Sequence, residues 1–245
     1  YAAFAEGYKV YFDPSTRFMR GLDSEGNWRT PFNPRASNHR NDDYCEGTAW
    51  QWTWFVPHDV DGLVELMGGR DAFIGKLDSL FTADSKLEGE STSVDISGLI
   101  GQYAHGNEPS HHIAHLYNYV GQPWRTQEIV DEVLHTLYFN NPDGLSGNED
   151  CGQMSAWYIL NAMGFYQVCP GKSVYSIGRP LFNEATVHLK DGKSFKVIAH
   201  NNSRDNKYVQ SIVLNGNKLE TPFFTHQDIV DGGTLELTMG SEPLK

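Results

Sequence analysis

The hydrophobic pattern of this 245-residue chain changes its period once, near Cys169-Pro170-Gly171, and that change limits the folds available to it. Before this point, apolar residues recur at helical spacing in residues 46–56, 71–82, 110–120, 125–138 and 150–163, with Pro- and Gly-containing breaks between the runs. Successive helices with short connections are typical of an α/α array. We therefore expect residues 1–170 to form a mainly helical domain.

Beyond Gly171 the chain concentrates β-forming residues. Runs at 185–189, 194–199 and 209–214 are separated by Asp191-Gly192 and Asn215-Gly216, which occur at the spacing of hairpin turns. Residues 225–229 predict a short helical crossover before a last strand at 234–239. Residues 171–245 are therefore predicted to form a small antiparallel β module, and the fold class is mainly α with a C-terminal β module.

Charge and hydropathy exclude two classes of partner. A net charge of −12 without a basic tract argues against nucleic acid and anionic membrane surfaces. No apolar stretch approaches the length of a membrane span, so we expect no membrane insertion. Six Trp among 13% aromatic residues suit a carbohydrate site, although a well-filled core needs the same residues.

The densest polar segment is HGNEPSHH, residues 105–112. Pro109 favours the first turn of a helix, so Asn107 and Glu108 are expected in the loop that enters it. Their oxygens suit a hard cation or a sugar hydroxyl, whereas imidazoles would suit zinc. The alternative without a ligand is a capped helix with surface histidines.

Two further segments combine carboxylates with tryptophan. Glu46, Trp50 and Trp54 are four residues apart, so on a helix they share one face, and a carboxylate at the head of an aromatic stripe suits a sugar. Simple core packing is the alternative for the tryptophans.

The second such segment holds Asn148, Glu149 and Asp150 at a predicted helix start, with Asp150, Gln153 and Trp157 on one face. Helix capping by the acidic residues is the alternative there. Together with Glu46, Asp150 gives the pair of carboxylates that glycosidic cleavage needs. The sequence leaves inversion and retention both open, since it does not give the distance between the two groups.

Three long motifs closely resemble glycoside hydrolase family 92: YCEGTAWQWTWFVPHD from Tyr44, HGNEPSHHIAHLYNYVGQPW from His105, and NNPDGLSGNEDCGQMSAWY from Asn140. The resemblance covers essentially the whole chain. It implies a calcium-dependent, inverting, exo-acting α-mannosidase that removes α-linked mannose, most simply α-1,2-linked, from glycans such as N-glycans. It also implies that residues 1–170 are the second half of an (α/α)6 barrel.

The resemblance assigns roles to individual residues. It makes Glu46 the general acid and Asp150 the general base, and it places Ca²⁺ near Asn107 and Glu108. Family members often carry a second carboxylate two residues before the base, where this chain has Asn148. Substrate contacts are expected at Trp50, Gln51, Trp54, His105, His111, His112, Asn148 and Gln153.

The chain begins Tyr1-Ala2-Ala3 without Met, and members of the resembled family are much longer. We therefore expect it to be the C-terminal part of a protein whose N-terminal β-sandwich and first barrel helices are its partners. The resemblance also implies a periplasmic, cell-surface or secreted location.

Other hypotheses remain open at this stage. A non-catalytic carbohydrate-binding module would use the tryptophans alone, and a zinc-dependent hydrolase would use His105, His111 and His112. Cys45 and Cys151 are expected to be buried small residues lining the site, and the alternative is a disulfide between two of Cys45, Cys151 and Cys169. The segment 13–40, long for a plain connector, is expected to help line the site.

Overall fold

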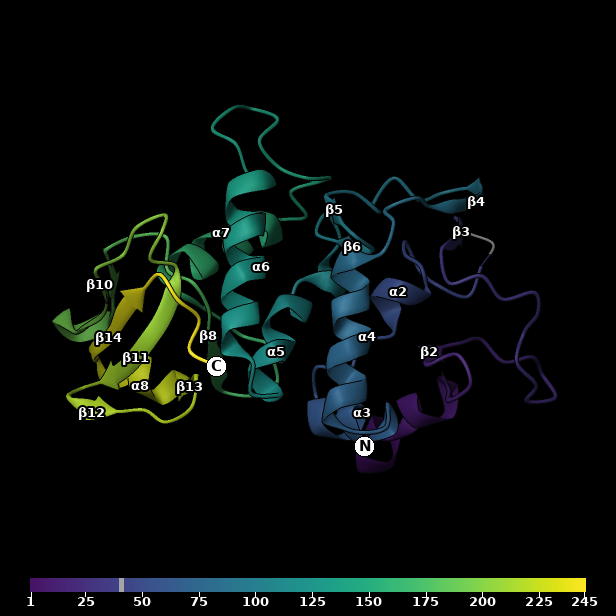
Figure 1. Ribbon diagram of the computed structural model, residues 1–245, viewed down its shortest axis with the longest axis horizontal. Helices are drawn as coiled ribbons and strands as arrows, with labels where there is room; N and C mark the ends of the chain where they lie inside the picture. The colour runs from purple at the N-terminus through teal and green to yellow at the C-terminus, as the bar shows by residue number, and fades with distance from the viewer. Residues whose placement is uncertain (40–41) are drawn as a thin grey trace. The chain divides into compact units, whose positions relative to one another are not determined.

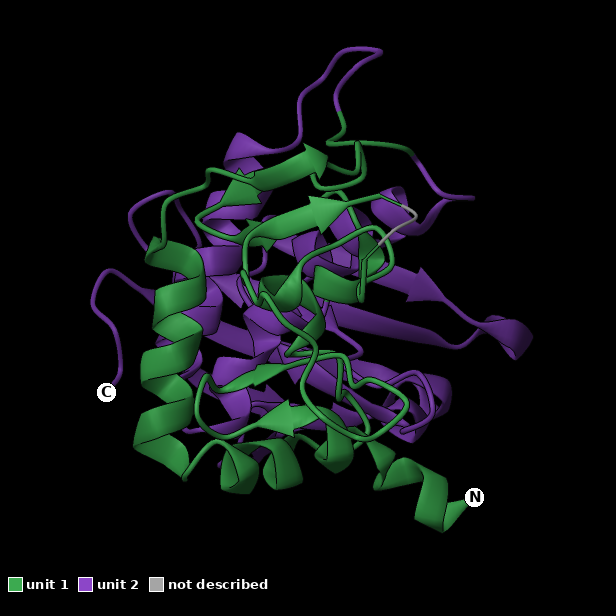
Figure 2. Ribbon diagram, turned by 90° about the vertical axis from the view of Figure 1, so that its right-hand side faces the viewer, with its two compact units in different colours: residues 1–111, 145–148 green, residues 112–144, 149–245 purple. Residues whose placement is uncertain are grey.

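The computed structural model describes residues 1–39 and 42–245, which form two compact units. Unit 1 comprises residues 1–111 and 145–148, and unit 2 comprises residues 112–144 and 149–245 (Figure 2). The two units are defined by which residues contact one another. By this definition the helices at 123–163 belong to the same unit as the C-terminal strands. The domain boundary at residue 170 stays a prediction. No helix in the described part of the chain is both long enough and apolar enough to span a membrane.

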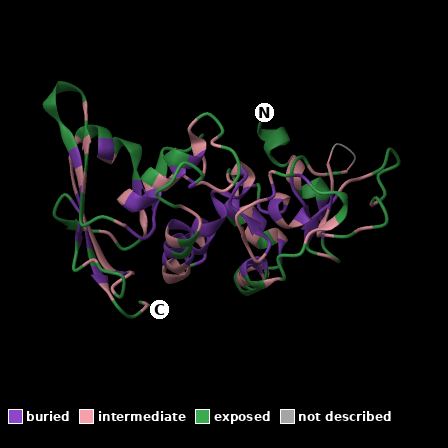
Figure 3. Ribbon diagram, turned by 90° about the horizontal axis from the view of Figure 1, so that it is seen from above, coloured by how far each residue is buried: buried purple, intermediate pink, exposed green. Residues whose placement is uncertain are grey.

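Unit 1 contains one helix of 13 residues, several shorter helices, and strands of two to four residues (Figure 1). Its longest helix buries Phe73, Leu77, Leu80 and Phe81 on one face, as helical spacing predicted. The first helix buries none of its residues (Figure 3). The elements are α1 Ala2–Ala5, η1 Gly7–Tyr11, β1 Phe12–Asp13, β2 Phe18–Met19, β3 Ala36–Asn38, α2 Ala49–Trp52, α3 Val60–Leu66, α4 Arg70–Thr82, β4 Glu88–Ser91, β5 Leu99–Ile100, β6 Tyr103–Ala104 and the 3-10 helix η2 Glu108–Ser110.

Unit 2 combines two helices of 14 and 11 residues with two sheets (Figure 1). Its elements are η3 Ile113–His115, α5 Leu116–Tyr119, α6 Pro123–Thr136, α7 Gln153–Met163, β7 Phe165–Tyr166, β8 Val174–Ile177, β9 Glu184–His188, η4 Lys190–Gly192, β10 Ser194–His200, β11 Tyr208–Leu214, β12 Asn217–Lys218, β13 Phe223–Thr225, α8 His226–Asp231 and β14 Gly233–Gly240.

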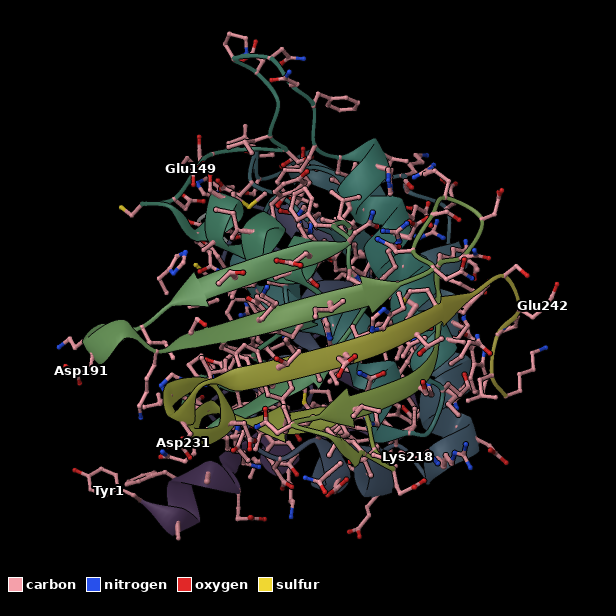
Figure 4. The ribbon with its side chains drawn as sticks, turned by 90° about the vertical axis from the view of Figure 1, so that its left-hand side faces the viewer. Tyr1, Glu149, Asp191, Lys218, Asp231 and Glu242 are labelled. Carbon is pink, nitrogen blue, oxygen red and sulfur yellow. The ribbon has the colours of Figure 1, made fainter. Side chains whose placement is uncertain are left out.

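The larger sheet of unit 2 has the strand order β12-β11-β14-β10-β9, and the smaller has β13-β8-β7. Side chains from both sheets and α8 form one core, in which the rings of Phe195 and Phe224 stack 5.8 Å apart. Figure 4 shows the larger sheet face on, with Asp191 at the turn between two strands. Asp191 and Gly192 both have positive φ, as do Asn215 and Gly216, so both predicted hairpin turns are confirmed.

The prediction of an antiparallel sheet is wrong in one respect. The β14 strand pairs in parallel with β10 and antiparallel with β11, so the sheet is mixed. The reason is the helical crossover that was predicted at 225–229: α8, capped by the Thr225 side chain, carries the chain to a central position between two earlier strands. The pattern of β-forming residues predicts each strand but not which strands become neighbours.

Helix boundaries also differ from the periodicity in three places. The predicted helix at 46–56 is reduced to α2, and the one at 150–163 begins only at Gln153. The run at 110–120 is divided into η2, η3 and α5. Positive φ at Glu46 and Asp150 explains the two shortened starts, because a left-handed residue cannot continue a right-handed helix.

Candidate active site

Glu46 lies in a loop that precedes α2, not on that helix. Its backbone is left-handed, with φ of 51°, and its side chain is exposed. The helix itself begins with Thr48 as its N-cap, where the side chains of Thr48 and Gln51 form a capping box. The expectation that Glu46, Trp50 and Trp54 share one helical face is therefore wrong. Glu46 is thus not part of a helical stripe with Trp50 and Trp54, and its loop backbone sets the direction of the carboxylate.

The HGNEP segment lies directly against this loop within unit 1. The Asn107 side chain donates from Nδ2 to the carbonyl oxygen of Glu46 at 2.9 Å. Its Oδ1 accepts from the backbone N–H of Glu108 at 3.1 Å, so Asn107 caps η2 with Pro109 in the first turn, as predicted. Two of the three motifs are thus joined by one side chain.

The oxygens of Asn107 and Glu108 are compatible with a hard cation. Glu108 is half-buried, and within residues 1–39 and 42–245 its carboxylate makes no hydrogen bond or ion pair. The Asn107 amide oxygen accepts one hydrogen bond and has a second lone pair. Ca²⁺ takes such oxygens and completes its shell with water or hydroxyl groups. These two side chains could supply part of a Ca²⁺ shell, and a calcium site here stays a prediction.

The histidines are not surface residues, which corrects one alternative. His105 and His111 are buried: the Tyr103 hydroxyl lies 2.8 Å from His105 Nδ1, and His111 Nε2 lies 2.9 Å from the His105 carbonyl oxygen. Burial lowers the pKa of His105 well below its ordinary value, with a further contribution from His111, and burial lowers the pKa of His111 to about 4. Burial therefore favours the neutral form of both rings.

These contacts do not support the zinc hypothesis. His112 is buried as well, but it belongs to unit 2, where it precedes η3. In the described parts of the chain, no group of three or more His, Cys, Asp or Glu side chains could hold a metal ion. The geometry gives His105 and His111 a packing role, and their contact with substrate stays a prediction.

The tryptophan segment is divided between core and surface. Trp54 is buried against the edge of Phe73, and the Nε2 of buried Gln51 donates to the Gln102 carbonyl oxygen at 2.5 Å. Trp50 is half-buried, with the Lys76 ammonium 4.7 Å from its ring centre. Trp54 and Gln51 therefore lie where packing residues lie, and core packing was the alternative named for the tryptophans of this segment. A role for either residue in sugar binding stays a prediction.

Asp150 occupies a loop before α7 in unit 2. It is exposed, and its φ of 52° is followed by positive values at Cys151 and Gly152. The neighbouring Glu149 has the capping role, because its carboxylate accepts from the Ser155 hydroxyl at 2.9 Å and from its backbone N–H at 3.2 Å. The acidic cluster therefore contains a capping residue and a separate carboxylate at left-handed backbone.

The remaining expected contacts in this motif are close to the surface. Asn148 is exposed in the 145–148 segment of unit 1, and the Nε2 of half-buried Gln153 donates to the Tyr166 hydroxyl at 3.3 Å.

Cys45 and Cys151 are exposed and Cys169 is half-buried, and all three are free thiols. The expectation of buried cysteines is wrong for the first two, because each lies in a loop beside a left-handed residue.

A pocket of about 440 Å³ opens beside Glu46 in unit 1. A second pocket of about 490 Å³ shares Asp43, Tyr44 and Cys45 with it and has Trp52 and Phe55 among its walls. Sequence reasoning missed Trp52, although it is part of the same tryptophan run. Met19 and Arg20, from the segment 13–40, also line the second pocket. Whether this segment lines the active site stays a prediction, and its last residue, Arg40, lies outside the described residues. The first pocket is lined by His39, Asp42, Asp43, Tyr44, Cys45 and Glu46.

The site thus has exposed carboxylates on left-handed loop residues, with a pocket beside Glu46. Comparison with known proteins shows the family to which these motifs belong. The model of the glycosyl hydrolase family 92 catalytic domain matches residues 1–241. The chain belongs to glycosyl hydrolase family 92.

Solved structures of two family members are similar to this chain. A family GH92 α-mannosidase from Bacteroides thetaiotaomicron, in complex with mannoimidazole, is 43% identical with a TM-score of 0.90, and the match covers 97% of this chain and 32% of that one. A family GH92 inverting mannosidase from Bacteroides thetaiotaomicron VPI-5482 is 41% identical with a TM-score of 0.83, covering 96% of this chain and 33% of that one.

A curated relative extends the likeness to another organism. An uncharacterized secreted glycosidase of Arthroderma benhamiae is 32% identical over 200 residues, which is 80% of this chain and 24% of the relative. The chain thus spans about a quarter to a third of the length of the relatives it matches. Membership in a catalytic-domain family favours an enzyme over a carbohydrate-binding module.

Proposed function

We propose that this chain carries the acid and the base of an exo-acting α-mannosidase that removes α-linked mannose, α-1,2-linked in the first instance, from glycans. The observation that carries the proposal is the left-handed backbone of both Glu46 and Asp150. Such strain persists only where the surroundings impose it, and it concentrates at functional sites. Both residues lie in motifs that match the family. The named activities of the two solved relatives support the choice of mannose.

In the proposed reaction, Glu46 donates a proton to the leaving oxygen of the glycosidic bond. Asp150 accepts a proton from the water that attacks the anomeric carbon on the opposite face of the ring. This single displacement inverts the configuration. It requires the two carboxyl groups to stand about 6.5–9.5 Å apart in the assembled enzyme, which leaves room for the water.

Asn107 and Glu108 are proposed to hold Ca²⁺, which when bound would orient mannose hydroxyls and favour the ring distortion that leads to an oxocarbenium-like transition state. Support comes from the Glu108 carboxylate, which has no partner in the described part of the chain, and from the position of Asn107 against the Glu46 loop. The amide of Asn107 fixes that loop through its nitrogen while its oxygen keeps one acceptor position for the cation.

We further propose that residues 1–170 form the second half of an (α/α)6 barrel. An N-terminal β-sandwich and the first barrel helices would complete the enzyme. A periplasmic, cell-surface or secreted location is supported by the name of the Arthroderma benhamiae relative. N-glycans are the proposed source of the mannose.

Digestion of linkage-defined mannobioses by the full-length enzyme tests this function. With calcium present, the α-1,2-linked disaccharide should release mannose faster than the α-1,3, α-1,4 and α-1,6 isomers. Addition of EGTA should abolish release, and restored calcium should recover it. Hydrolysis of none of these disaccharides would refute the proposal, while a preference for another linkage would change only the specificity.

A further inference from the structure

We propose that Trp52 is a positioning residue for the acid: its indole N–H holds the strained loop from which Glu46 acts. This inference rests on the proposed function of Glu46. It concerns a side chain that has no role in the reaction as outlined above.

Two successive carbonyl groups of the loop are held by side chains from different elements. Trp52, the last residue of α2, donates from Nε1 to the carbonyl oxygen of Cys45 at 2.8 Å. Asn107 donates to the carbonyl oxygen of Glu46 at 2.9 Å. The peptide groups on both sides of the Glu46 α-carbon are therefore fixed. These are the groups whose orientation defines φ and ψ at that residue.

The conformation needs such support. A residue with a Cβ atom is disfavoured in left-handed backbone, and Glu46 has φ of 51°. Its exposed side chain makes no hydrogen bond or ion pair with the described residues that could hold it there. The loop thus depends on its carbonyl contacts, and removing one of them lets the carboxylate move.

Gly47 shows how closely the indole fits beneath the loop. A Cβ atom built at Gly47 would lie 2.8 Å from Trp52 Nε1 and 2.9 Å from its Cδ1. Those distances are too short for any side chain, so only glycine lets the ring approach the residue after Glu46. The close packing of the indole against Gly47 and the hydrogen bond from the indole to the Cys45 carbonyl oxygen therefore depend on each other.

The indole is itself fixed by a rigid base. The two residues that flank Trp52 in the chain are both anchored: Gln51 donates to the Gln102 carbonyl oxygen, and the Thr53 hydroxyl accepts from the Met19 backbone N–H at 3.1 Å. The Phe55 ring meets the indole edge to face at 5.3 Å. Because the indole N–H of Trp52 is held in place, it keeps the Glu46 loop in place as well. An acid needs such a fixed position to meet the leaving oxygen.

The test uses Trp52→Phe in the full-length enzyme, which keeps a ring and removes the N–H. Hydrolysis is followed on mannobiose and on dinitrophenyl α-mannoside, because the mannobiose leaving group needs a proton and dinitrophenolate does not. A displaced acid should lower kcat/KM on mannobiose about tenfold, the usual consequence of losing a hydrogen bond of this kind, and change the activated substrate less than about twofold. Trp124→Phe, at a half-buried tryptophan of α6 in unit 2, should change neither rate.

Gly47→Ala provides a second, independent perturbation of the same contact, and it should produce the same selective loss on mannobiose. Equal losses on the two substrates for both variants, or no loss for either, would overturn the positioning role. The proposed function is judged separately by the unmodified enzyme: an inactive wild type refutes that function, whereas an active wild type with an unselective Trp52→Phe variant refutes only this inference.

Discussion

Glu46→Gly separates the chemical role of this residue from any structural one. The substitution removes the carboxylate proposed as the acid. It also removes the Cβ atom that makes left-handed backbone unfavourable at φ of 51°. A residue important for folding would lose stability when truncated to glycine, so the direction of the stability change is informative.

The magnitude follows from the surroundings of the side chain. It is exposed and makes no hydrogen bond or ion pair with the described residues, so its removal costs almost no contact energy. Relief of left-handed strain contributes about 1–2 kcal/mol, and the greater freedom of glycine in the unfolded chain offsets about 0.5–1 kcal/mol of it. The variant should therefore equal the wild type in stability or exceed it by about 1 kcal/mol.

Activity should change in the opposite sense. General acid catalysis contributes about a hundredfold to ten-thousandfold, so mannobiose hydrolysis should fall by that factor. Asp191→Gly is the matched control, because Asp191 is also exposed and left-handed, with φ of 60°, but lies in the β9–β10 turn. It should match Glu46→Gly in urea unfolding and keep full activity. A Glu46→Gly variant that is clearly less stable than the wild type, or that still cleaves mannobiose at a normal rate, would refute the reasoning.

Four further outcomes are expected. Asp150→Asn should abolish hydrolysis of mannobiose and of activated aryl mannosides alike, since both need the attacking water; a loss confined to one substrate would contradict a role as base. Glu108→Gln should raise the calcium concentration that gives half-maximal activity and should leave urea unfolding in EGTA unchanged; an unaltered calcium requirement places the metal elsewhere. Stability should fall as the pH is lowered from about 6.5 towards about 4. The pKa values of buried His105 and His111 are lower in the folded protein than in the unfolded chain, so the unfolded chain takes up protons first. Urea midpoints that stay flat across this window would show that these rings are protonated in the fold. The chain of residues 1–245 alone should have little or no mannosidase activity, since it spans about a third of its relatives, and full activity of this chain in a standard assay would prove that expectation wrong.

Local chemistry accounts for the parts of the fold that the sequence predicts well. The hairpin turns at Asp191-Gly192 and Asn215-Gly216 follow from residues that tolerate positive φ, and the α4 helix follows from its buried apolar face. The N-cap at Asn107 follows from the proline two residues later. Each of these features depends on neighbours within a few positions.

The features that sequence reasoning missed depend on distant partners. Glu46 has helical spacing with Trp50, which predicts that the two residues share a helix. In the structure Glu46 is itself left-handed and its carbonyl oxygen accepts from Asn107, so Glu46 lies outside the helix. The insertion of β14 beside β10 is likewise a long-range pairing. The burial of His105 and His111 is an exception, because their hydrogen-bond partners lie within six residues; it was missed because residue type alone does not show whether an imidazole is buried.

The stereochemistry of the first product tests the central claim most directly. Mannobiose hydrolysis by the full-length enzyme with calcium can be followed by proton NMR during the first minutes, before mutarotation mixes the anomers. Our assignment of Glu46 as acid and Asp150 as base predicts β-mannose as the first species, at a rate greatly reduced in the Glu46→Gln variant. Initial release of α-mannose, or an undiminished rate in that variant, would contradict the account.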